Sequence, residues 1–158
     1  MYNTRKFDVR VWAVVTDDFR IYFYKSGYIR TASSNYDLQN RNNYVHLTNQ
    51  CLQIKDKENY GTHEEGNTLS FQELQEYIDA NTSHGLKIEE HLLPRMMDMC
   101  IDTFLSVRHE LNPERRPNVF ELFGFDFLLD EDFRVWLIEC NTNPYLGTPC
   151  AYMKEMLP

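Results

Sequence analysis

The chain has 158 residues, of which 42% are hydrophobic and 14% aromatic, enough for one folded domain with a core. Its formal net charge of -8 argues against general nucleic-acid affinity, because that requires a net basic surface. We expect no membrane segment, because no apolar run approaches the length of a bilayer span and the first residues lack a signal-peptide pattern.

The four cysteines are Cys51, Cys100, Cys140 and Cys150. Their spacing contains no CxxC pair, which argues against a zinc site. We therefore expect buried free thiols in a protein of the reducing cytosol.

Apolar and polar residues alternate from residue 7 to 15, which predicts a β-strand near the start of the chain. One face of this strand carries Lys6, Asp8 and Arg10 in a row. A polar face of this kind usually lies in water. This face continues with Trp12, however, which favours a covered face on which the charges need partners.

Asp17 and Asp18 predict a turn, and residues 20–25 predict a second strand. Ser26 and Gly27 predict another turn before a short strand at 28–30, which gives an antiparallel meander.

Residues 31–66 are rich in loop-forming side chains, with a short ordered island at 44–53. Within the island, Thr48 and Asn49 have the chemistry to contact phosphate or sugar, although such residues more often only form turns.

Two helices are predicted in the middle of the chain. The first covers 70–80 and starts with a capping box of Ser70 and Glu73. The second covers 88–111, with Pro94 either as a kink or within a late first turn. Its predicted buried side consists of Leu92, Met96, Met99, Cys100, Phe104 and Val107.

A hairpin follows, with strands at 120–129 and 134–140 around the acidic turn 130–132, and a last helix covers 150–156. The order of strands, helices and strands predicts an α+β fold, with an antiparallel sheet and helices packed on one face.

The hairpin brings together the most informative polar residues of the chain. If its loop has an even number of residues, Asp126 lies opposite Glu139, and Asn141 lies one pleat further along. Val135, Leu137, Glu139 and Asn141 are then expected on one face, with Gly124 leaving space beside the cluster.

Two carboxylates face to face destabilise a sheet, and a hard cation would remove that penalty. Oxygen ligands with room for water and phosphate suit Mg²⁺. The alternative is a hairpin whose acids simply point into water.

Five segments, taken together and in this order, resemble tubulin tyrosine ligase and its ligase-like relatives. They are KFDVRVWAVV (6–15), YKSGYIRTAS (24–33), HLTN (46–49), ELFGFDFLLD (121–130) and VWLIECNTNP (135–144). NYGTHEEGN (59–67) is closer to tubulin tyrosine ligase itself, and NTNPYL (141–146) is closer to the polyglutamylase-like relatives. The resemblance covers essentially the whole chain and matches the C-terminal half of the family's ligase domain.

That family has an ATP-grasp fold and joins an amino acid to a protein carboxylate, usually on a tubulin tail, through an acyl phosphate. The resemblance implies that residues 1–158 form a single partial ATP-grasp domain, the C-terminal lobe of that fold. It also implies a ligase that uses ATP and Mg²⁺ to add tyrosine, glutamate or glycine to tubulin. Such a protein would be cytoplasmic, and associated with the cytoskeleton or cilium.

The resemblance assigns three groups of residues. The expected metal ligands are Asp126, Glu139 and Asn141. The expected nucleotide contacts are Lys6, Asp8, Thr48 and Asn49. Arg10 and Arg30 are expected to be catalytic, because guanidinium groups suit the anionic reactants.

Two other interpretations remain open at this point. The chain is alternatively a truncated, non-catalytic module that binds tubulin or another partner. It is also compatible with a small-molecule carboxylate–amine ligase, because a fold alone does not fix a substrate.

Overall fold

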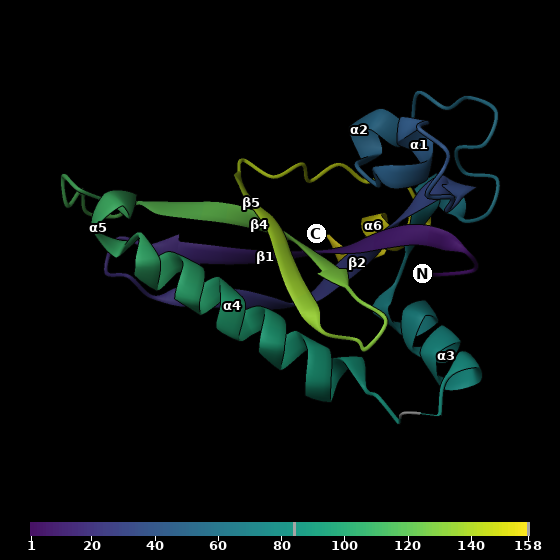
Figure 1. Cartoon of the computed structure of the whole chain (residues 1–158). Coiled ribbons are helices and arrows are strands. Elements are labelled where there is room, and N and C mark those ends of the chain that lie inside the picture. Colours follow the sequence, from purple (N-terminus) through teal and green to yellow (C-terminus); the bar gives the residue numbers. More distant parts are fainter. Residues whose placement is uncertain (84, 158) are drawn as a thin grey trace. The chain divides into compact units, whose positions relative to one another are not determined.

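The computed structural model describes residues 1–83 and 85–157 and has an α+β fold (Figure 1). Its strands are β1 (Arg5–Thr16), β2 (Ile21–Asn35), β3 (Thr68–Leu69), β4 (Phe120–Leu129) and β5 (Val135–Thr142). They form an antiparallel sheet in the order β3-β2-β1-β4-β5. The predicted α+β class is therefore confirmed, whereas the packing of helices on one face stays a prediction.

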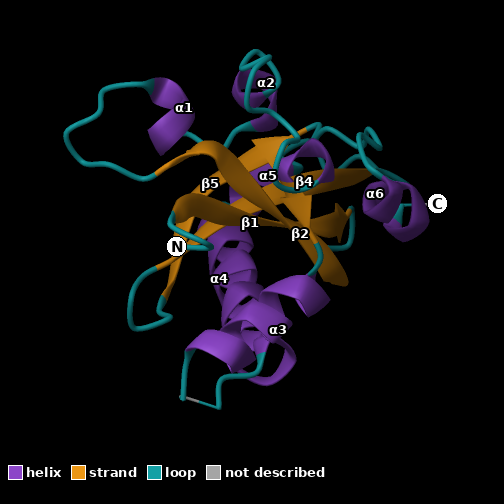
Figure 2. Cartoon of the chain, turned by 90° about the vertical axis from the view of Figure 1, so that its right-hand side faces the viewer, coloured by secondary structure: helices purple, strands orange, loops and turns teal. Residues whose placement is uncertain are grey.

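Most of the helices lie between β2 and β4 in chain order, and the last one follows β5 (Figure 2). They are α1 (Asn43–His46), α2 (Gln50–Gln53), α3 (Phe71–Asn81), α4 (Leu93–Ser106), α5 (Arg108–Leu111) and α6 (Ala151–Met156). A 3₁₀ turn at Glu65–Asn67 precedes β3, and a π turn at Ile88–Leu92 precedes α4.

The chain divides into two compact units. Unit 1 contains residues 1–9, 26–86 and the stretch from 146 onward, and unit 2 contains residues 10–25 and 87–145. Strands β1 and β2 both cross from one unit to the other. Each unit is described by itself below.

Strand β2 is longer than expected, because it continues straight through Ser26 and Gly27. The prediction of a turn there was wrong. Tyr28 and Ile29, directly after the glycine, are fully buried β-forming residues, and their packing outweighs the local turn preference. The Gly27 carbonyl instead accepts a hydrogen bond of 2.7 Å from the Tyr152 hydroxyl of α6.

In unit 1, the ordered island predicted at 44–53 is confirmed as α1 and α2. Helix α3 starts with the predicted capping box. The Glu73 backbone N–H donates to the Ser70 hydroxyl at 3.1 Å, and the Ser70 N–H donates to the Glu73 carboxylate at 2.7 Å. Leu74 and Ile78 on its inner face are buried.

In unit 2, helix α4 has Pro94 in its first turn, which settles the choice between a first-turn residue and a kink. Its buried face includes Cys100 and Phe104, and the Phe104 ring meets the Phe123 ring edge-on at 5.0 Å between centroids. The predicted burial of Val107 was wrong, because the helix ends at Ser106 and leaves Val107 40% exposed.

The hairpin of β4 and β5 is confirmed (Figure 1). Asp126 does lie opposite Glu139 in its register. The loop that joins the strands nevertheless has five residues, 130–134, which is an odd number. A β-bulge at Ile138 adds one residue to β5 and restores the pairing of Asp126 with Glu139.

The bulge also changes which residues of β5 share a face. Val135 and Leu137 pair with β4 residues on the face of Phe127, whereas Glu139 and Asn141 pair on the face of Asp126. The expectation that all four share a face was therefore wrong, because a bulge breaks the strict alternation of a strand.

All four cysteines are free thiols. Cys100 and Cys150 are buried as expected, but Cys51 and Cys140 are exposed, so the expectation of burial was wrong for these two.

Candidate functional site

Arg10 and Asp126 form a buried, two-pronged ion pair in unit 2. The Arg10 Nη2 group donates to Asp126 Oδ2 at 2.9 Å, and Arg10 Nε donates to the other carboxylate oxygen. Both side chains are at least nine-tenths buried. This geometry matches a planar guanidinium fork to a planar carboxylate, which is the strongest form of this interaction. Removing either partner would leave an uncompensated buried charge.

Gly124 makes this ion pair possible. A Cβ atom at position 124 would lie 2.8 Å from the Pro144 Cβ and 3.3 Å from Arg10 Nη1. The Arg10 guanidinium therefore packs directly against Gly124 while it binds Asp126. The prediction that Gly124 leaves space beside Asp126 is confirmed, and the neighbour that uses the space is Arg10.

Glu139 and Asn141 lie beside this pair and are more open to solvent. Glu139 is exposed and Asn141 is half-buried. The Asn141 amide donates to Glu139 Oε1 at 3.0 Å. Asn141 pairs with Gly124 across the hairpin, one step beyond the pair of Asp126 and Glu139. The structure thus brings together the three residues expected to bind a metal.

These donors fit a hard cation in chemistry, since the set consists of carboxylate and amide oxygens. Mg²⁺ usually binds through one or two carboxylates and keeps several waters. Both oxygens of Asp126 already accept hydrogen bonds from Arg10, which neutralises its charge, so Glu139 and Asn141 are the more accessible donors of the set. Over residues 1–83 and 85–157, no three His, Cys, Asp or Glu side chains gather closely enough to hold a metal by themselves.

The negative charge around Asp126 also acts on a neighbouring thiol. Burial of the thiol, and then the charges of Asp126 and Glu121, raise the pKa of Cys140 to about 11. Although Cys140 as a whole residue is exposed, its thiol therefore stays protonated at neutral pH.

Unit 1 contains a second buried ion pair, between Asp8 and Arg30. Arg30 donates to the Asp8 carboxylate from Nε at 2.6 Å and from Nη2 at 2.7 Å. The Thr48 hydroxyl donates to the same carboxylate, and all three residues are buried. The structure thus brings together one predicted catalytic residue and two predicted nucleotide contacts.

The other two predicted nucleotide contacts have different surroundings. Asn49 is exposed and caps α2, because its side chain accepts a hydrogen bond of 2.9 Å from the Cys51 backbone N–H. Lys6 is half-buried on β1, and it forms no ion pair within the described part of the chain.

The sequence analysis missed Gln53, which holds the Thr48 segment in place. Its Oε1 atom accepts a hydrogen bond of 2.9 Å from the Ser33 N–H of β2. Its Nε2 group donates to the backbone carbonyls of Tyr44, at 3.1 Å, and Leu47. Gln53 is fully buried, yet a polar residue in a loop-rich stretch gives no signal of burial.

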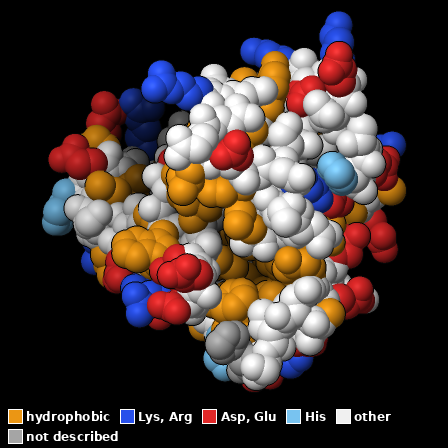
Figure 3. Space-filling model, turned by 45° about the vertical axis from the view of Figure 1, so that its right-hand side comes forward, with side chains coloured by type: hydrophobic (Ala, Val, Ile, Leu, Met, Phe, Trp, Pro, Cys, Tyr) orange, Lys and Arg blue, Asp and Glu red, His pale blue; other side chains and the backbone are white. Residues whose placement is uncertain are grey.

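The surface carries both charged and apolar side chains. Acidic side chains are scattered over the face drawn in Figure 3, and hydrophobic side chains are exposed between them. Among the described residues, no helix is both long and apolar enough to cross a bilayer.

Comparison with known proteins gives the family. The family model of the tubulin-tyrosine ligase family matches residues 1–158. The chain therefore belongs to the tubulin-tyrosine ligase family, as its motifs predicted.

Several curated relatives carry the name of a glycylase. Tubulin glycylase 3A of Drosophila melanogaster is 34% identical over 97% of the chain and 16% of its own length. The protein polyglycylase TTLL10 of Macaca fascicularis is 36% identical over the whole chain and 26% of its own length. The inactive polyglycylase TTLL10 of Homo sapiens is 35% identical over the whole chain and 24% of its own length. The chain thus spans about a quarter or less of these relatives.

Proposed function

We propose that this chain is part of an ATP- and Mg²⁺-dependent ligase that adds glycine to a carboxylate of tubulin. Family membership supports the class of reaction, and the names of the relatives support glycine and tubulin. We therefore propose glycine as the added amino acid rather than tyrosine or glutamate. The motifs alone left the choice among these three open. We further propose that residues 1–158 are one partial ATP-grasp domain, the C-terminal lobe of that fold, and that the protein works on the cytoskeleton or in cilia.

The single observation that carries the proposal is the facing pair of Asp126 and Glu139, with Asn141 beside it. We propose that these three residues hold Mg²⁺. Mg²⁺ held by these residues would supply positive charge beside the phosphates of ATP for the activation of the acceptor carboxylate. Arg10 fixes the position of the Asp126 carboxylate through its two hydrogen bonds.

We propose that the Asp8 cluster of unit 1 serves the nucleotide and the anionic reactants. Arg30 and Asp8 hold each other in a fixed geometry, which positions the Thr48 hydroxyl. Lys6 lies on β1, the strand that carries Asp8, and its ammonium group supplies a point charge that suits a phosphate oxygen. Asn49 contributes through the α2 cap that shapes the turn, and its exposed side chain can also meet a ligand.

Titration of Mg²⁺ at fixed ATP, followed by calorimetry, tests the metal assignment. We expect ATP binding to depend on Mg²⁺, and Glu139→Gln to weaken the apparent Mg²⁺ affinity by about tenfold or more, because a carboxylate ligand is lost. Glu131→Gln is the matched control, because Glu131 is an exposed acid in the loop of the same hairpin. Equal ATP binding with and without Mg²⁺ would show that the assignment is wrong.

Incorporation of radiolabelled glycine, glutamate or tyrosine into purified tubulin tests the substrate. We expect glycine to be incorporated and Asp126→Asn to abolish the signal. Incorporation of one of the other amino acids instead would replace glycine in the proposal.

A non-catalytic tubulin-binding module is the second candidate, and the relatives keep it open. The chain is 35% identical to a relative named inactive and 36% identical to one named active, so identity does not separate the two states. Co-sedimentation with microtubules, in the absence of any incorporated amino acid, would support this candidate. A small-molecule carboxylate–amine ligase would show turnover of ATP without tubulin.

A further inference from the structure

A turn in unit 1, residues 61–67, carries a carboxylate that has no role in the site described so far. It belongs to Glu64, whose side chain is only 12% exposed. Arg5 Nη1 donates to Glu64 Oε2 at 2.8 Å, and Arg5 Nη2 donates to Oε1. The Thr31 hydroxyl also donates to Oε2, at 2.9 Å. Both partners of Glu64 are buried, so its carboxylate links β1 to β2 inside the fold.

The turn that carries Glu64 is itself fixed to β2. The Asn67 N–H donates to the Glu64 carbonyl at 3.0 Å, and the Asn67 side chain accepts from the Gly61 N–H at 2.7 Å. The Asn67 amide also donates to the Thr31 carbonyl at 3.1 Å. Asn67 is buried and has a φ of 51°, a conformation that a residue with a side chain adopts where its contacts enforce it. The fold therefore sets the position of the Glu64 carboxylate.

The two partners of Glu64 are immediate neighbours of residues that we assign to ligand binding. Arg5 precedes Lys6 on β1, and Thr31 follows Arg30 on β2. Because successive side chains of a strand point to opposite faces, the two partners lie on the face opposite to that of Lys6 and Arg30. Glu64 therefore holds β1 and β2 together from behind the side chains proposed to meet the nucleotide and the anionic reactants.

Stability alone does not account for a buried ion pair at this place. Desolvation of two charges offsets much of their attraction, and a well-packed apolar pair of similar volume is often as stable or more so. The pair of Arg5 and Glu64 adds geometry, because a guanidinium fork matched to a carboxylate fixes both position and orientation. Arg5 Nη1 also donates to the Ala32 carbonyl at 3.1 Å, so the same side chain reaches from β1 to the backbone of β2. The pair thus fixes how the two strands lie against each other at this point.

We propose that Glu64 is a positioning residue for the cationic side chains of unit 1. Acting through Arg5 and Thr31, it fixes the backbone from which Lys6 and Arg30 project, and so sets the distance between their two cations. The inference rests on the proposed function, which assigns these cations to the nucleotide and the anionic reactants. It deepens that function, because Glu64 acts on the ligand only through other residues.

The test replaces the charged pair by an apolar one. Arg5→Met, Glu64→Leu and Thr31→Val, made together, remove both charges and the hydroxyl, so neither charge is left buried without its partner. Urea denaturation verifies that the triple variant is folded and unfolds cooperatively. If the pair only stabilised the fold, this variant would keep the native geometry and affinity of the site.

Two measurements report on the site itself. The first is solvent exchange of the Arg30 Nε–H, followed by nitrogen–proton NMR, since this group donates to Asp8 Oδ1 at 2.6 Å. The second is the affinity for ATP with Mg²⁺, measured by calorimetry. We expect the triple variant to exchange this proton about tenfold faster and to bind ATP about tenfold more weakly, because residues that orient ligand-binding side chains contribute on this scale.

Glu65→Gln is the matched control. Glu65 is the next acid of the same turn, but it is exposed and accepts a hydrogen bond of 3.1 Å from the Ala151 N–H, a role that glutamine can keep. Both measurements should change by less than about twofold in this variant.

Native exchange of the Arg30 Nε–H in the triple variant would overturn the inference, whatever its affinity for ATP. Faster exchange together with native ATP affinity would overturn it as well, since the two strands would then shift without any effect on the ligand. If the native protein itself bound no ATP, the proposed nucleotide role would fail, and the exchange rate would still decide whether Glu64 positions Arg30.

Discussion

Gly124 is the residue at which local packing constrains the Arg10–Asp126 ion pair most directly. In Gly124→Ala the new methyl group would meet Pro144 Cβ at 2.8 Å and the Arg10 guanidinium at 3.3 Å. We expect the free energy of unfolding to fall by about 1–3 kcal/mol, as overpacking usually costs. Urea denaturation measures this change.

A double-mutant cycle identifies the cause of that loss. Pro144→Gly removes the Cβ atom that the alanine would meet, so Gly124→Ala should cost less in the Pro144→Gly background than in the native protein. Strictly additive losses would mean that the steric contact is not responsible.

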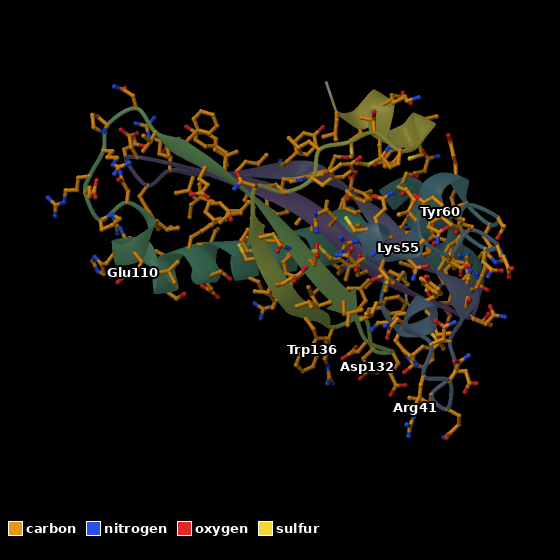
Figure 4. The ribbon with its side chains drawn as sticks, turned by 90° about the horizontal axis from the view of Figure 1, so that it is seen from above. Arg41, Lys55, Tyr60, Glu110, Asp132 and Trp136 are labelled. Atoms are coloured by element: carbon orange, nitrogen blue, oxygen red, sulfur yellow. The ribbon has the colours of Figure 1, made fainter. Side chains whose placement is uncertain are left out.

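Asp130 offers a residue-scale prediction about pH. The Trp136 indole N–H donates to its carboxylate at 2.8 Å and, together with the Arg134 backbone N–H, lowers the pKa of Asp130 below its ordinary value. Trp136 projects outward from the hairpin (Figure 4), so Trp136→Phe should raise the pKa of Asp130 without disturbing the core.

The sign of the stability effect follows from the lowered pKa. The contribution of Asp130 to stability is present above its unfolded pKa and is lost as pH falls through its folded pKa. Carboxyl NMR titration measures the pKa of Asp130 in the native protein and in Trp136→Phe. Asp18 is the internal control, because its lowered pKa depends first on Thr16, and it should not respond.

At the scale of residues, the sequence predicted which charged side chains would be covered, but it did not predict their partners. The row of Lys6, Asp8 and Arg10 indicated that buried charges would need partners. The actual partners, Asp126 for Arg10 and Arg30 for Asp8, lie 116 and 22 residues away in the chain. Such pairings depend on tertiary packing, which no local pattern encodes.

At the scale of elements, the buried side chain of Gln53 joins α1 and α2 to β2, and its loss should destabilise this part of the fold. Gln53→Leu would remove the hydrogen-bond partner of the Ser33 N–H and of the Tyr44 and Leu47 carbonyls. We expect a loss of about 2–3 kcal/mol in the free energy of unfolding, because buried polar groups would be left unpaired.

Hydrogen exchange distinguishes this effect from a general loss of stability. Amide exchange should accelerate most in α1 and α2, the two helices that Gln53 holds. Gln72→Leu on the exposed face of α3 is the matched control and should change stability by less than about 0.5 kcal/mol. Uniform acceleration throughout unit 1 would contradict the role given to Gln53.

Elements with a strong local signal were predicted well. The span of β4 was correct to the residue, and the cap of α3 was correct in its hydrogen bonds. The bulge at Ile138 was not predicted, because an isoleucine within a β-rich run looks like any other strand residue. The turn at Ser26–Gly27 failed for the opposite reason, since a strong local turn signal lies within a strand that packing keeps extended.

At the scale of the whole molecule, strand connectivity predicts cooperative unfolding. β1 and β2 each contribute residues to both units, so neither unit can unfold completely without breaking strands that the other one uses. We expect one thermal transition, with calorimetric and van't Hoff enthalpies that agree. Two resolved transitions in differential scanning calorimetry would contradict this and would argue against residues 1–158 as a single domain.

The bulge at Ile138 has a consequence for insertions and deletions in related genes. Leu137 already pairs with Phe127 and Glu139 with Asp126, so a homologue without a residue at 138 would keep both pairings. Loss of a residue between Glu139 and Asn141 would instead move the amide to the opposite side of the strand. A gap is therefore tolerable at position 138 of β5, whereas a gap at position 140 would indicate a relative in which the carboxylate and the amide no longer lie on the same side of the strand.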